Sequence, residues 1–371
     1  AFDKGPLVYQ ALAPVMGDSL LNSAGAVHHA HRQALAPAFA PRRRAGYAAT
    51  MTRCAAESAA GWSPGTSLAL APTLRRLTLR IMGDVLFGAA APPLDDLAPT
   101  IAAAVDHIGV ATRRLLPLPA AWPGGCAPAT RSTLRRFRQR IGAVVATRRA
   151  AGAGGDDLLA CLLQAGWSDA AIVDELRMFL VIGHETPANA LTWCFDLLAR
   201  HPAVAARLRA ELAAVLQGRL PTPADLAALP YTRQVIQETL RLYPPAWMLG
   251  RIARRPVDLP GCRIPRGGVI LVPIAALHRR ADRFPDPAAF QPERWTPAFT
   301  AALPRYAYMP FGAGPRACLA QHFALLELHL LLATLAARVV FTPVPGPPLV
   351  PDIRVTLRPA GRYPVTVQRI P

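Results

Sequence analysis

Apolar and polar residues alternate along most of the chain with the spacing of amphipathic or buried helices, and short stretches rich in proline and glycine separate them. This pattern predicts a mainly α-helical fold. The longest helical pattern lies in the middle of the chain, and a strongly apolar one lies near its end. The predicted helices cover residues 28–60, 72–88, 97–114, 129–150, 157–164, 169–200, 202–216, 231–243 and 317–338.

A smaller β-rich region is predicted at 249–275, where residues 257–265 are typical of a strand, a turn and a second strand. Another short pair of strands is predicted near 353–369. The chain shows no internal repeat and no long linker, and the glycine-rich stretch 151–155 is typical of a surface connection. The sequence therefore predicts one domain, residues 1–371, with a helical part and a small β-rich subdomain.

Composition limits the possible classes of protein. With 371 residues, 52% of them hydrophobic and 17% charged, the chain is not of the disordered class. Its net charge of +18 comes almost entirely from arginine, since Lys4 is the only lysine among 41 basic residues. Arginine, alanine, proline and glycine all have GC-rich codons, so genome composition accounts for much of this charge. No basic run is interleaved with aromatic residues, so the sequence does not predict nucleic-acid binding. A basic face for an acidic protein partner is the favoured interpretation.

The cysteines are scattered and form no C-x-x-C pair, which argues against a zinc ribbon and a disulfide scaffold. A reducing, cytoplasmic setting is the corresponding prediction. The first residues have no signal-peptide pattern, and no uninterrupted apolar run reaches about 18 residues, so no membrane span is predicted. The six cysteines are Cys54, Cys126, Cys161, Cys194, Cys262 and Cys318.

The most informative stretch is 311–320, which ends a glycine-bearing loop directly before the last helical pattern. A sulfur at a helix N-terminus faces free N–H groups and the positive end of the helix dipole, which stabilises the thiolate of Cys318. Gly312 and Gly314 leave room for a flat ligand against the backbone. Arg316 offers a cation to carboxylates on such a ligand. These features favour a haem site over a buried structural cysteine after an ordinary glycine turn.

This stretch resembles the haem-ligand loop of the cytochrome P450 family, whose pattern is Phe-x-x-Gly-x-Arg-x-Cys followed by any residue and Gly or Ala. Phe311, Gly314, Arg316, Cys318 and Ala320 occupy all the specified positions. The resemblance covers essentially the whole chain and implies the family's mainly helical fold. It also implies haem b as cofactor, with the Cys318 thiolate as axial iron ligand and with Phe311, Gly312 and Arg316 at the cofactor.

Inside the longest helical pattern, Glu185 and Thr186 precede Pro187. An acid and a hydroxyl are expensive in a buried helix unless they have partners, and the proline is expected to bend or open the helix. The segment resembles the family's distal oxygen-activation helix, which implies that Glu185 and Thr186 organise protons for oxygen chemistry. A simple helix kink with satisfied polar groups is the alternative. Ile182 departs from the family, which has a small residue there, and Pro187 replaces a common second threonine.

Glu238 and Arg241 lie three residues apart on one predicted helix face, where opposite charges meet. Such a pair alone is usually a solvated surface pair. Here it precedes two prolines and the later segment 290–295, an order that resembles the family's Glu-x-x-Arg helix and Pro-Glu-Arg segment. The resemblance implies a buried charge network of Glu238, Arg241 and Arg294 that braces the cysteine loop.

Three histidines in residues 28–31 suggest a metal site, but His28 and His29 are adjacent and point to different helix faces, and no second ligand pair has matching spacing. The segment resembles instead the family helix that contacts the haem propionates, with His28 and Arg32 in the contacting positions. Tryptophan is common where His28 stands. Arg251 and Arg316 are the other predicted propionate partners.

The resemblance implies a monooxygenase that inserts one atom of O2 into a hydrophobic small molecule by hydroxylation or epoxidation. Terpenoids, polyketides, fatty acids and steroids are the candidate substrates. The predicted pocket also includes the segment before Gly25 and the turn at 359–360. Its side chains are mostly apolar, and the remaining predicted members are Val181, Ile182, His184, Ala246, Trp247, Met248 and Leu249.

About fifty residues follow Cys318, too few for a fused flavin reductase. A separate ferredoxin or flavodoxin with an NAD(P)H-dependent reductase is therefore predicted, together with a monomeric state. Family members begin with a further helix and the first strands of a sheet upstream of a residue such as Phe2. An additional natural segment before Phe2, with a targeting or anchor function, is therefore left as an alternative.

Two other functions remain open. A family member can carry out peroxide-driven oxidation or oxidative coupling, or the chain can be a non-catalytic haem- or ligand-binding protein. The Glu185–Thr186 pair favours dioxygen activation, because peroxide users do not need a proton relay. Ile182 and Pro187 keep the non-catalytic alternative open.

Overall fold

The computed structural model describes residues 2–4, 12–88, 91, 94, 96–112, 127–152 and 154–370. Cys126 and the last two residues of the predicted helix 97–114 lie outside these ranges. The chain divides into two compact units, and each unit is assembled from three segments of sequence. Unit 1 contains Ala1–Ala38, Met82–Gly183 and Met248–Pro273, and unit 2 contains Phe39–Ile81, His184–Trp247 and Ile274–Pro371. Helices α4 (Leu70–Phe87) and α8 (Asp169–Arg200) each run from one unit into the other.

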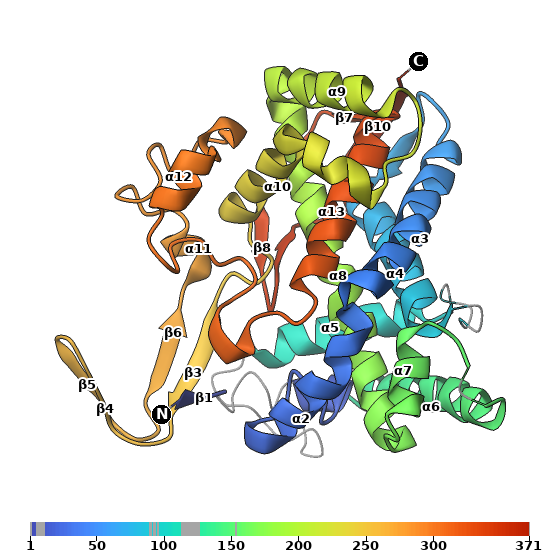
Figure 1. Cartoon of the computed structure of the whole chain (residues 1–371), viewed down its shortest axis with the longest axis vertical. Coiled ribbons are helices and arrows are strands. Elements are labelled where there is room, and N and C mark those ends of the chain that lie inside the picture. The colour runs from blue at the N-terminus through green and yellow to red at the C-terminus, as the bar shows by residue number, and fades with distance from the viewer. Residues whose placement is uncertain are drawn as a thin grey trace. The chain divides into compact units, whose positions relative to one another are not determined.

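Unit 1 combines helices with two small antiparallel sheets. Helix α5 packs against α6, and α2 packs against α7. Strand β3 lies between β1 and β6, and β4 forms a hairpin with β5 around Gly261, whose φ of +81° is the left-handed value that a glycine adopts without strain (Figure 1). The elements are α2 (Gly25–Leu35), α5 (Ala98–Thr112), α6 (Pro128–Ala150), α7 (Leu158–Gln164), β1 (Phe2–Asp3), β3 (Leu249–Ala253), β4 (Val257–Leu259), β5 (Cys262–Ile264) and β6 (Val269–Val272).

Unit 2 contains the remaining helices, a sheet in the order β2–β10–β7 and the hairpin β8–β9. Its helices are α3 (Pro41–Ala60), α9 (Pro202–Leu216), α10 (Pro230–Leu242), α11 (Ile274–Leu277), α12 (Pro297–Ala302) and α13 (Gln321–Ala336). Its short 3-10 helices are η3 (Pro223–Ala228), η4 (Pro292–Arg294) and η5 (Gly314–Arg316), and its strands are β2 (Ser67–Ala69), β7 (Val339–Pro343), β8 (Pro351–Ile353), β9 (Leu357–Pro359) and β10 (Pro364–Arg369).

Helix α13 forms the centre of unit 2. It is apolar on nearly every side, and from Leu326 to Ala336 each residue is buried. A helix with this composition is stable only where other elements surround it. Helices α3, α9 and α10 and strand β7 pack against α13 (Figure 1). The chain enters this central helix three residues after Cys318, so the cysteine loop is attached to the best-packed helix of the unit.

The predicted fold class is confirmed: the structure is mainly helical, with small antiparallel sheets at 249–272 and near the C-terminal end. The prediction of one continuous helix over 28–60 is wrong. Its middle is a 3-10 turn, η1 (Ala36–Phe39), because Pro37 and Pro41 lack the N–H groups that a continuous α-helix needs. Pro41 instead starts α3, at the one place in a helix where proline fits without loss.

The last helix begins at Gln321 and not at 317, since η5 and the residues around Cys318 form a separate turn. Strands β1, β2 and β7 were not predicted. Within the described ranges, the helices are all too short or too polar to cross a membrane.

Candidate active site

Cys318 lies exposed on the loop between η5 and α13. Its backbone N–H donates to the carbonyl of Phe311 at 2.9 Å, and the N–H of Gly312 donates to the carbonyl of Met309 at 3.0 Å. These two hydrogen bonds fold the chain into a tight turn that returns on itself between Met309 and Cys318. The turn places Cys318, an exposed residue, directly before the central helix of unit 2.

Two glycines shape this loop. Gly312 and Gly314 have φ values of +70° and +69°, in the left-handed region that other residues rarely adopt. A Cβ atom added at Gly314 would meet no heavy atom within 4 Å, so the loop is open on that side. The N-cap residue of α13 is Ala320, which has no capping side chain, so the first N–H groups of the helix remain available to stabilise a nearby anion.

The other described cysteines differ from Cys318 in their surroundings. Cys54 and Cys194 are buried, and burial raises the pKa of the Cys194 thiol to about 12, which keeps it protonated. Cys262 is exposed, but it lies in the β4–β5 hairpin and not before a helix. Cys318 therefore combines exposure with a helix start, the two conditions that favour a reactive or metal-binding thiolate.

Helix α8 carries Glu185 and Thr186 and remains α-helical through Pro187. Of the two predicted effects of this proline, an opened helix is therefore not found, and a bend stays a prediction. Buried residues on both sides of Pro187 hold the helix in place, and the hydroxyl of Thr78 donates to the carbonyl of His184 at 2.7 Å. Packing thus maintains the helix where the proline removes one backbone hydrogen bond.

The Glu185 carboxyl group is buried, with 6% of the residue exposed, and its Oε1 atom accepts a hydrogen bond from the hydroxyl of Thr356 at 3.0 Å. Burial raises the pKa of Glu185, while the Thr356 hydrogen bond and the charges of Arg358 and Arg75 act in the opposite direction. A carboxyl group in this environment can exist in its neutral form and exchange a proton. Thr186, next to it on the helix, is half-buried.

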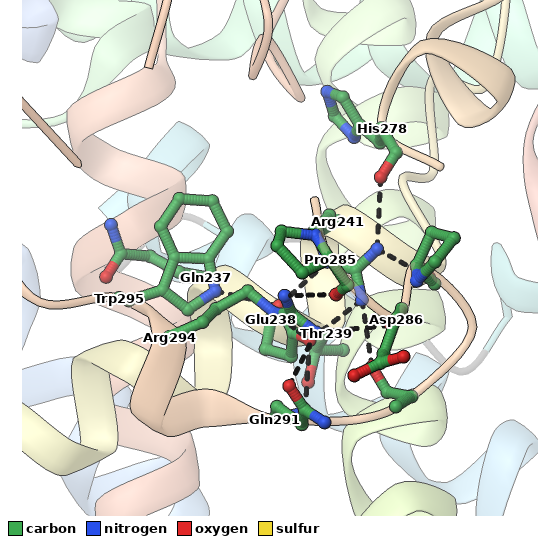
Figure 2. A network of polar contacts seen from close by, with 12 residues as sticks. Gln237, Glu238, Thr239, Arg241, His278, Pro285, Asp286, Gln291, Arg294 and Trp295 are labelled. Carbon is green, nitrogen blue, oxygen red and sulfur yellow. Dashed lines mark hydrogen bonds and ion pairs between the residues drawn. The ribbon is translucent and has the colours of Figure 1, made fainter. Parts of the chain in front are cut away.

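Glu238 and Arg241 on α10 form a completely buried ion pair with two hydrogen bonds of 2.8 Å. The same carboxylate accepts from the Nε of Arg294 at 3.0 Å, from the indole N–H of Trp295 at 2.8 Å and from the backbone N–H of Gln291 at 3.0 Å. Figure 2 shows these donors gathered around Glu238. Its charge is thus fully matched by hydrogen-bond donors, as a buried carboxylate requires.

The Arg241 guanidinium also ties α10 to the segment that follows α11. It donates to the carbonyls of His278 at 3.0 Å, Pro287 at 2.7 Å and Ala289 at 2.9 Å. Arg294 donates to the carbonyl of Pro285 at 2.7 Å. The network therefore holds helix α10, the segment 278–291 and the 3-10 helix η4 together.

Sequence reasoning did not identify three members of these clusters. Trp295 directly follows the Pro-Glu-Arg segment, so its position next to Arg294 could have suggested that its indole N–H joins the network. His278 and Thr356 stand in stretches with no motif, and nothing in the sequence indicated their partners.

The remaining predicted pocket residues are distributed over both units. In unit 2, His184 is buried, Ala246 is half-buried, and the indole N–H of Trp247 donates to the carbonyl of Arg354 at 2.8 Å. In unit 1, Val181 is buried, whereas the half-buried members are Ile182, Met248 and Leu249. Their role in a substrate pocket stays a prediction.

The predicted propionate contacts also belong to both units. On α2 in unit 1, His28 is buried and Arg32 half-buried; on β3, Arg251 is half-buried and donates to the carbonyl of Gly250 at 2.7 Å. Arg316 is half-buried in unit 2. The cofactor contacts of these residues stay predictions.

The other two histidines near His28 have separate environments. His29 is exposed, and Nδ1 of His31 lies 2.8 Å from Oε1 of Glu175. Across the described ranges of the chain, no group of three or more His, Cys, Asp or Glu side chains could hold a metal ion.

A mainly helical fold, an exposed cysteine directly before the central helix of unit 2 and a buried Glu-Arg-Arg network are features expected of a haem-thiolate protein. The cytochrome P450 family profile matches residues 1–363, and the chain belongs to this family of oxidoreductases. It is 37% identical to cyclooctat-9-en-7-ol 5-monooxygenase of Streptomyces melanosporofaciens over 93% of this chain and 77% of the relative.

Two further similarities agree with this assignment. Pentalenene oxygenase of Streptomyces avermitilis is 32% identical over 91% of this chain and 77% of its own length. A cyanobacterial cytochrome P450 solved with retinoic acid superimposes with a TM-score of 0.89 at 27% identity, covering 100% of this chain and 85% of that one.

Members of the family hold a haem whose iron is bound by a cysteine thiolate. The donor set of this chain fits that group. Cys318 is an exposed thiol beside a helix start, and the backbone at Gly314 is open to a flat ligand. Family members also use O2 and redox partners, and they bind hydrophobic substrates.

Proposed function

We propose that the chain is a monooxygenase that uses O2 to hydroxylate a cyclic terpenoid. The observation that carries the proposal is the position of Cys318, whose backbone N–H donates to the Phe311 carbonyl directly before the central helix. The terpenoid class is supported by the two bacterial relatives, whose names specify cyclooctat-9-en-7-ol and pentalenene. The mostly apolar character of the predicted pocket residues agrees with such a substrate.

Cys318 would hold the haem iron as a thiolate, with Phe311 and Gly312 against the cofactor. Arg32, Arg251 and Arg316, together with His28, would bind its propionates. When bound, the haem supplies the activation of O2 for insertion into a C–H bond. The start of helix α13 at Gln321 favours the anionic thiolate form of Cys318 over the neutral thiol, and the thiolate is the form that binds a metal.

Glu185 and Thr186 would control the protons that this chemistry consumes. The Oε1 atom of Glu185 accepts the hydrogen bond of the Thr356 hydroxyl. Because burial raises the pKa of Glu185, the carboxyl group can hold a proton inside the protein and release it to a neighbouring hydroxyl. The Thr186 hydroxyl is the adjacent candidate on the same helix.

The electrons would come from a separate acidic ferredoxin or flavodoxin that docks on an arginine-rich face beside Cys318. The net charge of +18 favours such a partner through long-range attraction. Electron transfer from a donor of this kind should slow strongly as salt rises from low to high concentration. A rate independent of salt would argue against an acidic partner.

The first experiment is the carbon monoxide difference spectrum of the dithionite-reduced protein. A strongly red-shifted Soret band is expected for the wild type, and Cys318→Ser should lose it while Cys194→Ser keeps it. A histidine-like spectrum, or an unchanged band in the Cys318 variant, would disprove the ligand assignment. Binding spectra with a panel of cyclic terpene hydrocarbons, fatty acids and steroids would then test the substrate class.

The proton role is tested by coupling, the fraction of electrons that appear in product. Thr186→Ala should divert most of the NAD(P)H consumption away from product. Thr192 lies on the same helix, and its hydroxyl donates to the carbonyl of Ala188 at 2.7 Å, so Thr192→Ala is the matched control. Unchanged coupling in Thr186→Ala, or product formation with peroxide alone at the full rate, would favour the peroxide-driven alternative.

A further inference from the structure

His278 contacts the Glu238–Arg241 network through its backbone carbonyl and the chain before the cysteine loop through its ring. The residue is completely buried directly after α11. Its backbone carbonyl accepts from the Arg241 guanidinium at 3.0 Å, which Figure 2 shows as a dashed line. Its ring atom Nε2 accepts from the backbone N–H of Met309 at 2.9 Å. One residue therefore contacts both the buried charge network and the chain that leads to the cysteine.

The hydrogen bond to Met309 fixes the chemical state of the ring. A backbone N–H only donates, so Nε2 must be unprotonated, and the neutral imidazole carries its hydrogen on Nδ1. Burial lowers the pKa of His278 to about 4, the charges of Arg241 and Arg279 act in the same direction, and the nearby backbone of Arg241 and Leu240 opposes the change. The ring is therefore neutral at pH 7 and serves as an acceptor.

From Met309 the contacts continue to the ligand. The Met309 carbonyl accepts from the N–H of Gly312 at 3.0 Å, and the Phe311 carbonyl accepts from the N–H of Cys318 at 2.9 Å. Fixing the N–H of Met309 thus fixes one end of the turn whose other end holds the backbone of Cys318. A displacement of Met309 would move both of these hydrogen bonds.

Tyr308 strengthens the same connection. Its ring packs against the His278 ring with centroids 5.1 Å apart, and its hydroxyl donates to the carbonyl of Gln237 at 3.1 Å. Residues 308 and 309 are therefore attached to helix α10 by two independent routes, one through the tyrosine and one through the histidine. Only the histidine route reaches the backbone N–H at the start of the turn.

We infer that His278 is a positioning residue for the cysteine loop, whose imidazole acceptor transmits the fixed position of the Glu238–Arg241 pair to the backbone around Cys318. A buried histidine that only fills space would not need a particular acceptor atom. The effect on haem ligation rests on the proposed function, whereas the effect on the loop backbone does not.

The test compares three variants of the haem-loaded protein. The side-chain oxygen of His278→Gln reaches the place of Nε2, that of His278→Asn reaches only the place of Nδ1, and His278→Leu has no acceptor. The first measurement is amide hydrogen exchange in peptides covering 309–318. The second is the fraction of the reduced carbon monoxide complex with the red-shifted, thiolate-bound Soret band.

The Gln variant should resemble the wild type in both measurements. The Asn and Leu variants should exchange the amides of Met309 and Cys318 roughly 10-fold faster or more, as expected for loss of a buried hydrogen bond. They should also convert a large fraction of the complex to the blue-shifted form with a neutral thiol. His329 is the control, because its buried ring bonds the carbonyl of Leu325 within α13 and not the loop; His329→Leu should leave both measurements on the loop unchanged.

Unchanged exchange and an unchanged spectrum in the Asn and Leu variants would overturn the inference. A Gln variant as defective as the Leu variant would overturn it too, because ring volume would then matter and not the acceptor. If the Leu variant does not fold, the Gln and Asn pair decides alone. A wild type without the thiolate band would disprove the proposed function, while the exchange measurement would still test His278.

Discussion

The indole N–H of Trp295 donates to the same Glu238 carboxylate that Arg241 binds with two hydrogen bonds, and no part of Glu238 or Arg241 is exposed. A buried ion pair contributes little when complete, because desolvation offsets the attraction, but removal of one partner leaves an uncompensated charge. Removal of one partner should therefore destabilise the folded protein by more than the complete pair stabilises it. Arg294 adds a second cation that depends on the same carboxylate.

Glu238→Gln should therefore lower the free energy of unfolding by about 3–5 kcal/mol and reduce the haem bound per protein. Urea denaturation and the ratio of haem to protein absorbance measure the two effects. Glu57 is the matched control, since it pairs with Arg80 at 2.6 Å on the surface of the same unit, and Glu57→Gln should change little. Normal folding and haem content in the Glu238 variant would show that the network does not brace the site.

Thr356 supplies the test of Glu185 as a proton carrier. Thr356→Val removes a hydrogen bond that lowers the pKa of Glu185. The pKa of Glu185 should therefore be higher in this variant than in the wild type. Because the proposed proton donor is the neutral acid, the alkaline limb of the pH–rate profile should move to higher pH. Thr342→Val, at an exposed position of β7, should leave the profile in place. A shift in both variants, or in neither, would exclude control by the Thr356–Glu185 contact.

Local chemistry made several elements predictable from sequence. Helix α9 has the predicted bounds, because Pro202 suits the first helical position and Gln217 ends the helix in the left-handed conformation. The cysteine loop was recognisable because its glycines, arginine and cysteine stand within eight residues of one another. The helix predicted over 28–60 failed where two prolines outweighed a continuous apolar spacing.

Contacts between distant segments could not be predicted in this way. Thr356 lies 171 residues from Glu185, and Met309 lies 31 residues from His278. The hydrophobic periodicity of the sequence does not indicate that Thr356 contacts Glu185 or that the backbone of Met309 contacts His278. These pairs follow from the packing of strands and loops against helices, which hydrophobic spacing alone does not specify.

Glu327 on α13 gives a prediction about stability. The residue is buried, and neither carboxyl oxygen has a hydrogen-bond partner in the described part of the chain. Burial raises the pKa of Glu327 well above 4.5, so the folded protein keeps the acid neutral. In the unfolded chain the acid ionises above its ordinary pKa, and the wild type should lose about 1.4 kcal/mol of stability per pH unit from there up to the folded pKa.

Glu327→Gln cannot ionise and should be more stable than the wild type at pH 8 but similar at pH 4. Urea denaturation at a series of pH values measures this difference. A constant difference across the series would mean that Glu327 is ionised in the folded protein and has a partner. Glu57→Gln again serves as the surface control and should give a curve parallel to the wild type above about pH 6, where Glu57 is ionised in both the folded and the unfolded chain.

Stability due to His278 should depend on pH in the opposite sense to that due to Glu327. Burial lowers the pKa of this histidine from 6.5 to about 4 in the folded state, so between these values the unfolded chain binds a proton that the folded protein excludes. The stability due to neutral His278 is complete above pH 6.5 and is lost as the pH falls toward 4. The full loss corresponds to about 3 kcal/mol, and roughly 2 kcal/mol of it should appear between pH 7 and pH 5.

His278→Gln retains the acceptor for Met309 but has no proton to gain, so it should lose less stability than the wild type over this range. Urea denaturation at pH 7 and pH 5 compares the two proteins, with the exposed His29→Gln as the control that follows the wild type. Equal acid sensitivity of the wild type and His278→Gln would mean that the folded protein accepts a proton on the imidazole. Since Nε2 would then face the Met309 N–H with a second donor, that result would also require the hydrogen bond to Met309 to break.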